Sequence, residues 1–328
     1  MKITRRNAMV ATAALAMTSA LALPAKAAME LKWAHVYETG EPYHQQALWA
    51  AEEIKKRTNG EISISVFPAS QLGNENQINE GLTLGTVDII YTGVAFAGSI
   101  FKPISISNAP FILRDFDHWK AYRDSPLFGE MADGYNQASG NHVVALTYYG
   151  QRNLTANKEI KTPADMKGMK LRVPPAPLYL MFTKAVGANA TPIAFAEVYL
   201  ALQQGTVDGQ ENPLPTIKAK KFYEVQSHIM LSEHITESLL TIVGPHIWSQ
   251  LSDDQKKIFE DVLREAASNS TETIRKAEGE LAAWFTEQGT TVVEVDRGPF
   301  IEAAKPLHND PESGAGWTQE QYDALQAL

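Results

Sequence analysis

The stretch "GMKLRVPPAP" at residues 168–177 places a charged side chain inside an apolar, strand-like run. Arg172 lies between Leu171 and Val173, and Pro174 ends the run. A guanidinium is always charged and is costly to bury without a partner. The sequence therefore predicts a buried counterpart for Arg172, which is either an internal carboxylate or an acidic ligand.

Strand-like and helix-like segments alternate on both sides of this stretch. Strand patterns occur at 31–36, 62–67, 87–93, 142–150, 170–174 and 238–248, helix patterns occur at 43–60, 75–85 and 178–188, and a helix, a turn and a short strand follow one another at 196–213. Such alternation is typical of an α/β fold.

A long helical pattern at 252–289 follows the last of these strands. Ser252 and Gln255 have the spacing of a capping box, and Gly289 ends the pattern. At 1.5 Å per residue, this helix would reach more than about 50 Å, so we expect it to lie along two domains.

The length of 328 residues also indicates about two domains. The alternating segments suggest that the chain crosses between them more than once. We expect one domain to comprise 28–149 and 238–277, and the other to comprise 150–237 and 278–328.

The beginning of the chain has the features of an export signal. The basic pair Arg5-Arg6 precedes an apolar stretch at 8–23 and the small-x-small motif "AKA" at 25–27. This order predicts a signal peptide at 1–27 that is cleaved on export to the periplasm, by the Sec or the twin-arginine route. An uncleaved anchor is the alternative, although the apolar stretch is short for a membrane span.

The composition limits the classes of function. The formal net charge of −9 becomes −13 without residues 1–27, because that segment holds four basic residues and no acidic one. Such an acidic balance argues against nucleic-acid binding. The chain has no cysteine, so it forms no disulfide after export.

Motifs of common enzymes are missing from the sequence. It contains no G-x-S-x-G elbow, P-loop, H-E-x-x-H or G-x-G-x-x-G motif. His228 and His234 are six residues apart, which matches no common zinc spacing. We therefore expect no catalysis, no cofactor and no metal. The rival hypothesis is an exported enzyme that acts on uronic acids.

Two arginines and an amide fall near predicted strand ends, where open α/β sheets bind ligands. Arg172 is near the end of its strand, Arg152 is two residues beyond Gly150, and Asn212 is in the turn before Pro213. Arginine pairs with carboxylates through two parallel hydrogen bonds. We expect these three side chains to form a carboxylate receptor, and the alternative is that each arginine pairs with an internal acid.

Several longer motifs resemble one family. They are "ADMKGMKLRVP" (164–174), "VGANATPIAFAEVYLALQQGTVDGQENP" (186–213) and "KKFYEVQ" (220–226), together with "FPASQLG" (67–73) and "LGTVDI" (84–89). Over roughly 30–305, the chain resembles the substrate-binding subunits of tripartite ATP-independent periplasmic (TRAP) transporters, the DctP family.

This resemblance implies a two-domain periplasmic binding protein fold of type II-like character. The two α/β domains would surround a cleft, with hinge strands between them and a long bracing helix. It further implies a receptor, not an enzyme, that closes on a small organic acid and docks to the small and large membrane subunits. We expect a monomer. A receptor of an ABC transporter or of a sensor kinase is the alternative.

The resemblance also assigns residues of the site. Arg172 matches the carboxylate-clamping arginine of the family, Arg152 matches a second arginine, and Asn212 matches the amide that orients the same carboxylate. Phe195 in "PIAFAEVY" matches a ring that packs against the ligand. The resemblance thus implies that the partner of Arg172 is the substrate carboxylate.

The nearest pattern within the family is the sialic-acid-binding branch. Glu75 and His234 stand where that branch has polar ligand contacts. The match breaks at Gly93 and Phe96, where that branch carries a glutamate and an arginine near the far end of its ligand. A pocket without these two charges should bind the polyol tail of sialic acid poorly.

The end of the first strand also departs from that branch, at His35, Val36 and Tyr37. We expect His35 and Tyr37, with Gly93 and Phe96, to face the ligand from the other domain. The predicted ligand is a hexuronate or an aldonate. The alternatives are sialic acid, a less hydroxylated mono- or dicarboxylate, a keto acid, or an amine or alcohol if Arg172 serves folding.

Overall fold

The computed structural model describes residues 28–328. The predicted signal peptide at 1–27 lies outside the described residues. Within 28–328, none of the helices combines the length and the apolar character needed to cross a membrane.

The first lobe is built on three parallel strands. β1 (Met29–Ala34) lies between β2 (Ile62–Phe67) and β3 (Ile89–Gly93). Helices α1 (Pro42–Arg57) and α2 (Glu75–Leu84) connect these strands, close to the predicted positions. β3 is buried along its whole length, as its mostly apolar sequence without polar alternation predicts.

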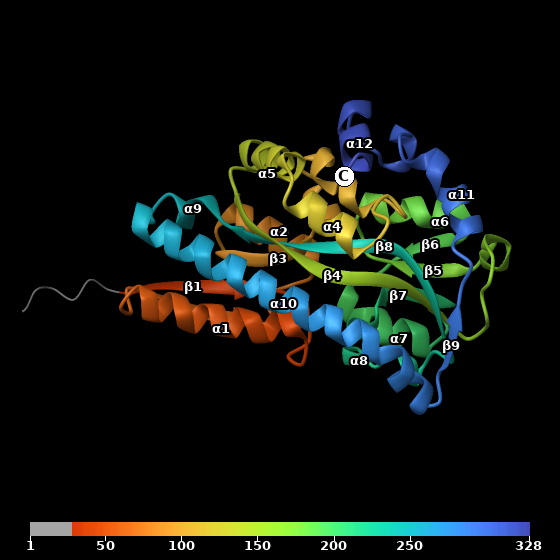
Figure 1. Cartoon of the computed structure of the whole chain (residues 1–328). Coiled ribbons are helices and arrows are strands. Elements are labelled where there is room, and N and C mark those ends of the chain that lie inside the picture. The colour runs from red at the N-terminus through yellow and green to blue at the C-terminus, as the bar shows by residue number, and fades with distance from the viewer. Residues whose placement is uncertain (1–27) are drawn as a thin grey trace, which may run out of the picture.

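Two long strands run through both lobes. β4 (His142–Ala156) and β8 (His228–Val243) pair antiparallel, β8 also pairs with β3, and β4 also pairs with β7 (Gly209–Pro213). The described strands therefore form one sheet in the order β2-β1-β3-β8-β4-β7-β5-β6, with β9 paired to β8. Figure 1 shows β4 and β8 crossing the centre of the molecule.

The sequence placed the end of the β4 strand wrongly. It was expected to end at Gly150, but the strand continues to Ala156, so Arg152 lies within it. Gly150 instead lies at a register irregularity in the β4–β8 ladder. It has φ of 122°, and a Cβ there would lie 2.8 Å from Cβ of Pro213. Glycine is thus required by a bulge and a close approach, not by the end of the strand.

The second lobe contains the strands β5 (Lys170–Val173) and β6 (Asn189–Pro192) beside β7. β5 pairs in parallel with both neighbours, and α6 (Leu180–Val186) and α7 (Val198–Gln203) provide the crossovers. The expectation that Asn212 lies in a turn is wrong, since it lies in β7 opposite Asn153 of β4. Likewise, β8 begins ten residues before the predicted 238, at His228.

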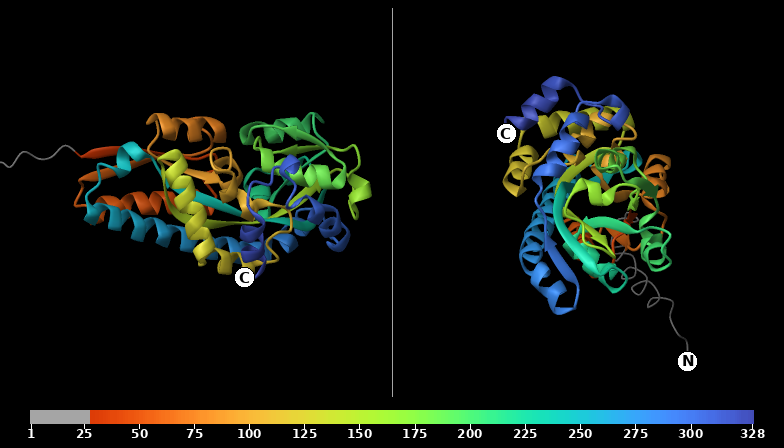
Figure 2. Two further views of the ribbon diagram at one scale, coloured as in Figure 1. Left: turned by 90° about the horizontal axis from the view of Figure 1, so that it is seen from above. Right: turned by 90° about the vertical axis from the view of Figure 1, so that its right-hand side faces the viewer.

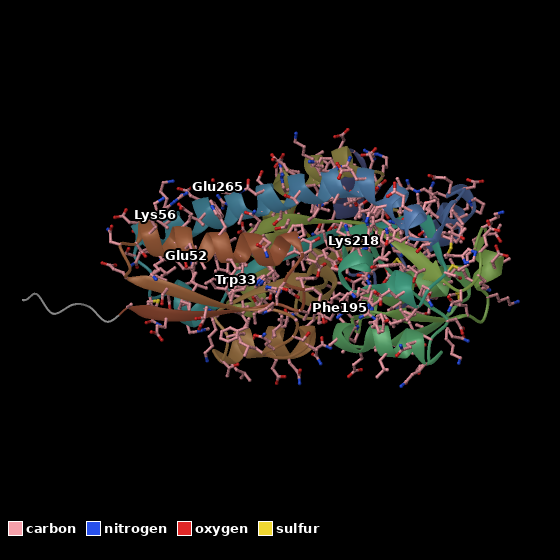
Figure 3. The ribbon with its side chains drawn as sticks, turned by 90° about the horizontal axis from the view of Figure 1, so that it is seen from below. Trp33, Glu52, Lys56, Phe195, Lys218 and Glu265 are labelled. Atoms are coloured by element: carbon pink, nitrogen blue, oxygen red, sulfur yellow. The ribbon has the colours of Figure 1, made fainter. Side chains whose placement is uncertain are left out.

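Helix α10 (Asp253–Glu287) braces both lobes. It has 35 residues and begins with the predicted capping box between Ser252 and Gln255. It packs on α1 in the first lobe, on β4, and on α8 (Leu214–Ala219) in the second. Figure 2 shows it along one side of the elongated molecule, and Figure 3 shows it side by side with α1.

The last segments return across the molecule. β9 (Thr291–Glu294) extends the sheet beside β8, and α11 (Gly298–Ala304) packs on α6. α12 (Gln319–Gln326) contacts α5 (Pro126–Ser139). The remaining helices are α3 (Val94–Ala97), α4 (Phe116–Arg123) and α9 (Pro245–Trp248). Because strands and helices run through both lobes, the exact domain boundaries stay a prediction.

Candidate ligand-binding site

A narrow cavity lies between the two lobes. It is nearly closed, with a free volume of about 20 Å³, which is about what one water molecule needs. The walls are formed by Tyr37, Glu75, Gly93, Phe96, Tyr149, Arg152, Arg172, Pro174, Tyr179, Phe195, Asn212, Glu237 and Leu239. Figure 3 shows Phe195 at the edge of the second lobe that faces the first. Since the lining side chains are almost all buried, a ligand can enter only when the lobes separate.

Arg172 is the cation in this cavity that lacks an acidic partner within hydrogen-bonding distance. β5 holds it in the buried wall, where its Nε and Nη2 both donate to the carbonyl oxygen of Ile193, at 2.9 and 2.7 Å. Its Nη1 has no partner among the described residues. Burial lowers the pKa of Arg172 to about 10, although the charges of Glu75 and Glu211 raise it. The Nη1–Nη2 edge of the guanidinium thus remains available for a carboxylate.

Arg152 is equally buried, but four of its five N–H groups donate to Glu211 and Glu237. Its Nε and Nη2 donate to the carboxylate of Glu211, and its Nη1 donates to Oε2 of Glu237 at 2.9 Å. Burial raises the pKa of Glu211, but Arg152 and the hydrogen bond with His234 outweigh burial and lower it to about 2. Arg152 thus has internal acidic partners, and its part in ligand binding stays a prediction.

Glu237 was not identified from the sequence. It lies on β8 and is buried, and its Oε1 accepts a hydrogen bond from the hydroxyl of Tyr179 at 2.8 Å. Burial raises the pKa of Glu237 to about 7, against the lowering effect of Arg152. Glu211 and Tyr149 were also missed. Both glutamates are charged residues within buried strands, which is the signal that identified Arg172.

Glu75 is the first residue of α2 and lines the cavity. Its Oε2 is buried and has no partner among the described residues. Burial raises the pKa of Glu75, whereas the charges of Arg172 and Arg152 lower it. The carboxyl group of Glu75 is thus free to form a hydrogen bond with a ligand.

Asn212 is part of a chain of polar contacts that leads out of the cavity. Its Nδ2 donates to Oε1 of Gln210 at 2.6 Å, and its Oδ1 accepts from the hydroxyl of Tyr149 at 3.3 Å. The Thr216 hydroxyl lies 3.0 Å from that of Tyr149 and 2.8 Å from Oε1 of Glu41. These contacts fix the amide of Asn212 in one orientation at the cavity wall.

The two predicted histidines lie behind the wall. His234 contacts Oε2 of Glu211 at 3.2 Å through Nε2, and its ring stacks on Phe182. His35 lies 3.2 Å from His44, and burial, with His44, lowers the pKa of His35 to about 3. Neither ring lines the cavity, whereas the other predicted site residues do.

The rim of the cavity carries an ion pair between the lobes. Nζ of Lys220, just after α8, lies 2.7 Å from Oε1 of Glu38, which lies in the loop between β1 and α1. The same ammonium group is 5.1 Å from the ring centroid of Phe195. Residues 28–328 contain no group of three or more acidic, histidine or cysteine side chains placed to hold a metal ion.

The comparison with family models gives a match over residues 33–313, to the DctP model, described as bacterial extracellular solute-binding protein, family 7. The chain belongs to this family. The predicted family and the two-domain α/β fold are thereby confirmed. Members of family 7 are extracellular solute-binding proteins, which agrees with the predicted export, whereas the export route stays a prediction.

Family 7 relatives match over most of their length. The sialic acid-binding periplasmic protein SiaP of Vibrio cholerae is 35% identical over 300 residues, which cover 92% of this chain and 94% of SiaP. A TRAP periplasmic solute binding protein from Polaromonas sp. JS666, solved with D-erythronate, is 31% identical with a TM-score of 0.86, over 92% and 99% of the two chains. One from Shewanella oneidensis, solved with succinate, is 27% identical with a TM-score of 0.87, over the same shares.

Proposed function

We propose that this protein is the periplasmic receptor of a TRAP transporter and that it captures a hydroxylated monocarboxylate, such as an aldonate or a hexuronate. The observation that carries the proposal is the buried Nη1 of Arg172, which has no partner among the described residues although it lines the inter-lobe cavity. The charges of Glu75 and Glu211 act on Arg172 without a direct hydrogen bond, and an incoming carboxylate would supply the directly bound partner.

The geometry of Arg172 suits such a carboxylate. The bonds to Ile193 hold the guanidinium in place through Nε and Nη2 and leave one N–H of Nη2 and both N–H groups of Nη1 unused. A carboxylate can therefore accept two parallel hydrogen bonds from the Nη1–Nη2 edge. Asn212 lies on a neighbouring strand in the same wall, and Phe195 places its ring 6.0 Å from the guanidinium.

The charge balance of the cavity favours one carboxylate over two. Three acids, Glu75, Glu211 and Glu237, lie at or directly behind the wall with two arginines. Arg152 is already engaged with two of these acids and keeps one unused N–H on Nη1, so only Arg172 can offer a carboxylate two parallel hydrogen bonds. A dicarboxylate would bring its second charge close to glutamates, whereas hydroxyl groups could donate hydrogen bonds to them.

Aromatic rings at both ends of the cavity favour a second candidate, a short and less hydroxylated acid. Phe96 from the first lobe and Phe195 from the second bring apolar surface to the ligand. Such rings can pack against the carbon chain of a small hydroxy or keto acid. Sialic acid suits the cavity less, since Gly93 and Phe96 carry no charge with which to pair its polar tail.

Delivery to the membrane is the other half of the proposal. Closure of the lobes on the acid would present the closed form to the small and large membrane subunits. The Glu38–Lys220 pair joins the lobes in this structure, and a ligand that contacts both lobes would add to it and shift the population towards closure.

Calorimetry on a panel of acids tests the proposal. The panel contains D-gluconate, L-galactonate, D-glucuronate, D-erythronate, pyruvate, succinate and sialic acid. We expect a hydroxylated monocarboxylate to bind most tightly, and Arg172→Lys to abolish most of that affinity, since lysine lacks the fork geometry. Arg123→Lys on the surface of α4 is the control. Failure of every acid to bind would refute the proposed function, and a ligand that is chemically altered on incubation would indicate an enzyme.

A further inference from the structure

Gly93 has no side chain to contribute to the first-lobe wall of the cavity. Tyr179 of the second lobe and Glu237 of β8 occupy the space beside it. A Cβ at Gly93 would lie 3.3 Å from the hydroxyl oxygen of Tyr179 and 3.5 Å from Oε1 of Glu237. The space into which a side chain at position 93 would project is therefore taken by these two polar atoms. The wall is polar here, but its polarity comes from Glu237 and Tyr179 and not from residue 93.

Glu237 is held rigidly in this position. Its Oε2 accepts a hydrogen bond from Nη1 of Arg152 and its Oε1 accepts one from Tyr179, while both oxygens are buried at the cavity. Each carboxylate oxygen can accept two hydrogen bonds, so each retains one acceptor position. Tyr179 in turn lies under the guanidinium of Arg152, whose carbon is 5.2 Å from the ring centroid. The carboxylate thus presents acceptor positions with a fixed geometry.

We propose that Glu237, positioned by Arg152 and Tyr179 above Gly93, is the residue that selects a hydroxylated monocarboxylate and rejects a dicarboxylate. The inference rests on the proposed function, because it concerns the part of the ligand beyond the carboxylate bound by Arg172. A ligand hydroxyl can donate to the free acceptor position of Glu237. A second ligand carboxylate has no proton to donate to these acceptor positions, and it meets a like charge where Glu237 is ionised.

The supporting contacts explain why Arg152 does not attract the second carboxylate itself. Its Nε and Nη2 are bound by Glu211, and its Nη1 is bound by Glu237. The charge of Arg152 is thereby used to keep two acids close together inside the protein. Arg152 retains a single N–H, whereas Glu237 retains an acceptor position on each oxygen, so the selectivity depends on this carboxylate.

The test compares two ratios of dissociation constants. Calorimetry measures the dissociation constants of succinate and of the tightest-binding aldonate. The succinate value divided by the aldonate value is the ratio, and it is determined for the wild type and for Glu237→Gln. We expect Glu237→Gln to weaken aldonate binding by about 10- to 100-fold, the range for a hydrogen bond to a charged group, while succinate binding is unchanged or improved. The ratio should then fall by at least about tenfold. Tyr179→Phe should lower it less, and it serves as the test if Glu237→Gln does not fold.

Glu278 provides a matched control. This partly buried glutamate of α10 also accepts from a tyrosine, Tyr148 at 3.0 Å, and pairs with an arginine, Arg275 at 3.1 Å, but it does not line the cavity. Glu278→Gln should lower stability and leave the ratio unchanged. The inference is overturned if Glu237→Gln and Glu278→Gln change both affinities by one common factor. If the wild type binds acids and loses them all on Arg172→Lys, the proposed function stands even when this inference fails.

Discussion

The two arginines of the cavity are buried to the same degree but differ in their partners. Arg152 on β4 is bound by Glu211 and Glu237, which belong to the protein. Arg172 on β5 has a backbone carbonyl on one side and, among the described residues, no partner for Nη1 on the other. The difference teaches that a charge inside an apolar strand predicts a partner, and that only the fold shows whether the protein supplies it.

The largest effect that this comparison predicts is on stability. Arg152→Ala would leave Glu211 and Glu237 buried without their counter-charge, so we expect the free energy of unfolding to fall by about 3–5 kcal/mol. Urea denaturation of the ligand-free protein measures the change. Adding Glu211→Gln to Arg152→Ala should restore part of the loss. An unchanged urea midpoint for Arg152→Ala would contradict the assignment of Arg152 as an internally paired residue.

Arg172→Ala should have the opposite profile. We expect ligand affinity to fall by about 2–5 kcal/mol, as for truncation of one partner of a buried charge pair. The stability of the ligand-free protein should stay the same or rise, because Arg172 has no directly bound acid and burial disfavours its charged form. Calorimetry and urea denaturation on the same preparation separate the two quantities. A large loss of stability with intact affinity would show that Arg172 serves folding.

The pH dependence of the free energy of unfolding tests the acids that pair with Arg152. Burial raises the pKa of Glu237 to about 7 from an ordinary value of 4.5, so its protonated form favours the folded state. The groups that face it are Arg152, Glu211, Tyr179 and Tyr149. The contribution of Glu237 to the free energy of unfolding is therefore fully present below about pH 4.5, and it is lost as the pH rises towards 7.

Glu41 adds to this trend, because burial raises its pKa to about 7 as well. Glu211 has the opposite effect, but only at low pH. Because its pKa is lowered to about 2, its contribution to the free energy of unfolding is lost as the pH falls from about 4.5 towards 2. His35 opposes the trend of Glu237 and Glu41, because its pKa is lowered to about 3 and its neutral folded form therefore gains stability as the pH rises towards 6.5. We expect Glu237→Gln to make the change in the free energy of unfolding between pH 5 and pH 7 more positive than in the wild type. A slope that Glu237→Gln leaves unchanged would show that other groups dominate the titration.

The smallest predicted effect concerns the rim. Lys220→Met removes the pair with Glu38, whose side chain is about a third exposed, so the interaction contributes only about 0.2–1 kcal/mol. Because the pair joins the two lobes, we expect a faster ligand release rate and an unchanged association rate. Stopped-flow kinetics of Lys220→Met, Glu38→Gln and the double variant give the coupling. Additive effects of the two substitutions would mean that the pair does not support closure.

The sequence predicted much of the fold because the relevant signals are local. The capping box at Ser252 and the apolar strand at 87–93 depend on neighbouring residues only. The ends of β4 and β7 were misplaced because they depend on pairing between distant segments, such as Asn153 with Asn212. Local turn signals cannot show that two long strands support each other across the whole molecule.

The site was predictable to a similar extent. Most of the proposed residues line the cavity, but their part in binding remains a prediction. Glu211 and Glu237 were missed although they carry the same signal as Arg172, since a resemblance to a family directs attention to known positions. Tyr179 lies in a short 3₁₀ turn at Pro177–Tyr179, where no periodic pattern indicates which way a side chain faces. Finding it required the three-dimensional structure.

The continuity of β4 and β8 has a mechanical consequence. Any separation of the lobes must bend these two strands, because they are shared by both halves and are not interrupted by a linker. Their ladder has three irregularities, between Val143 and Ala145, between Tyr148 and Gly150 and between Arg152 and Leu154, where bending is least opposed. The last one starts at the arginine that holds Glu237, so elastic deformation of the sheet and the shape of the pocket are set by the same stretch of backbone.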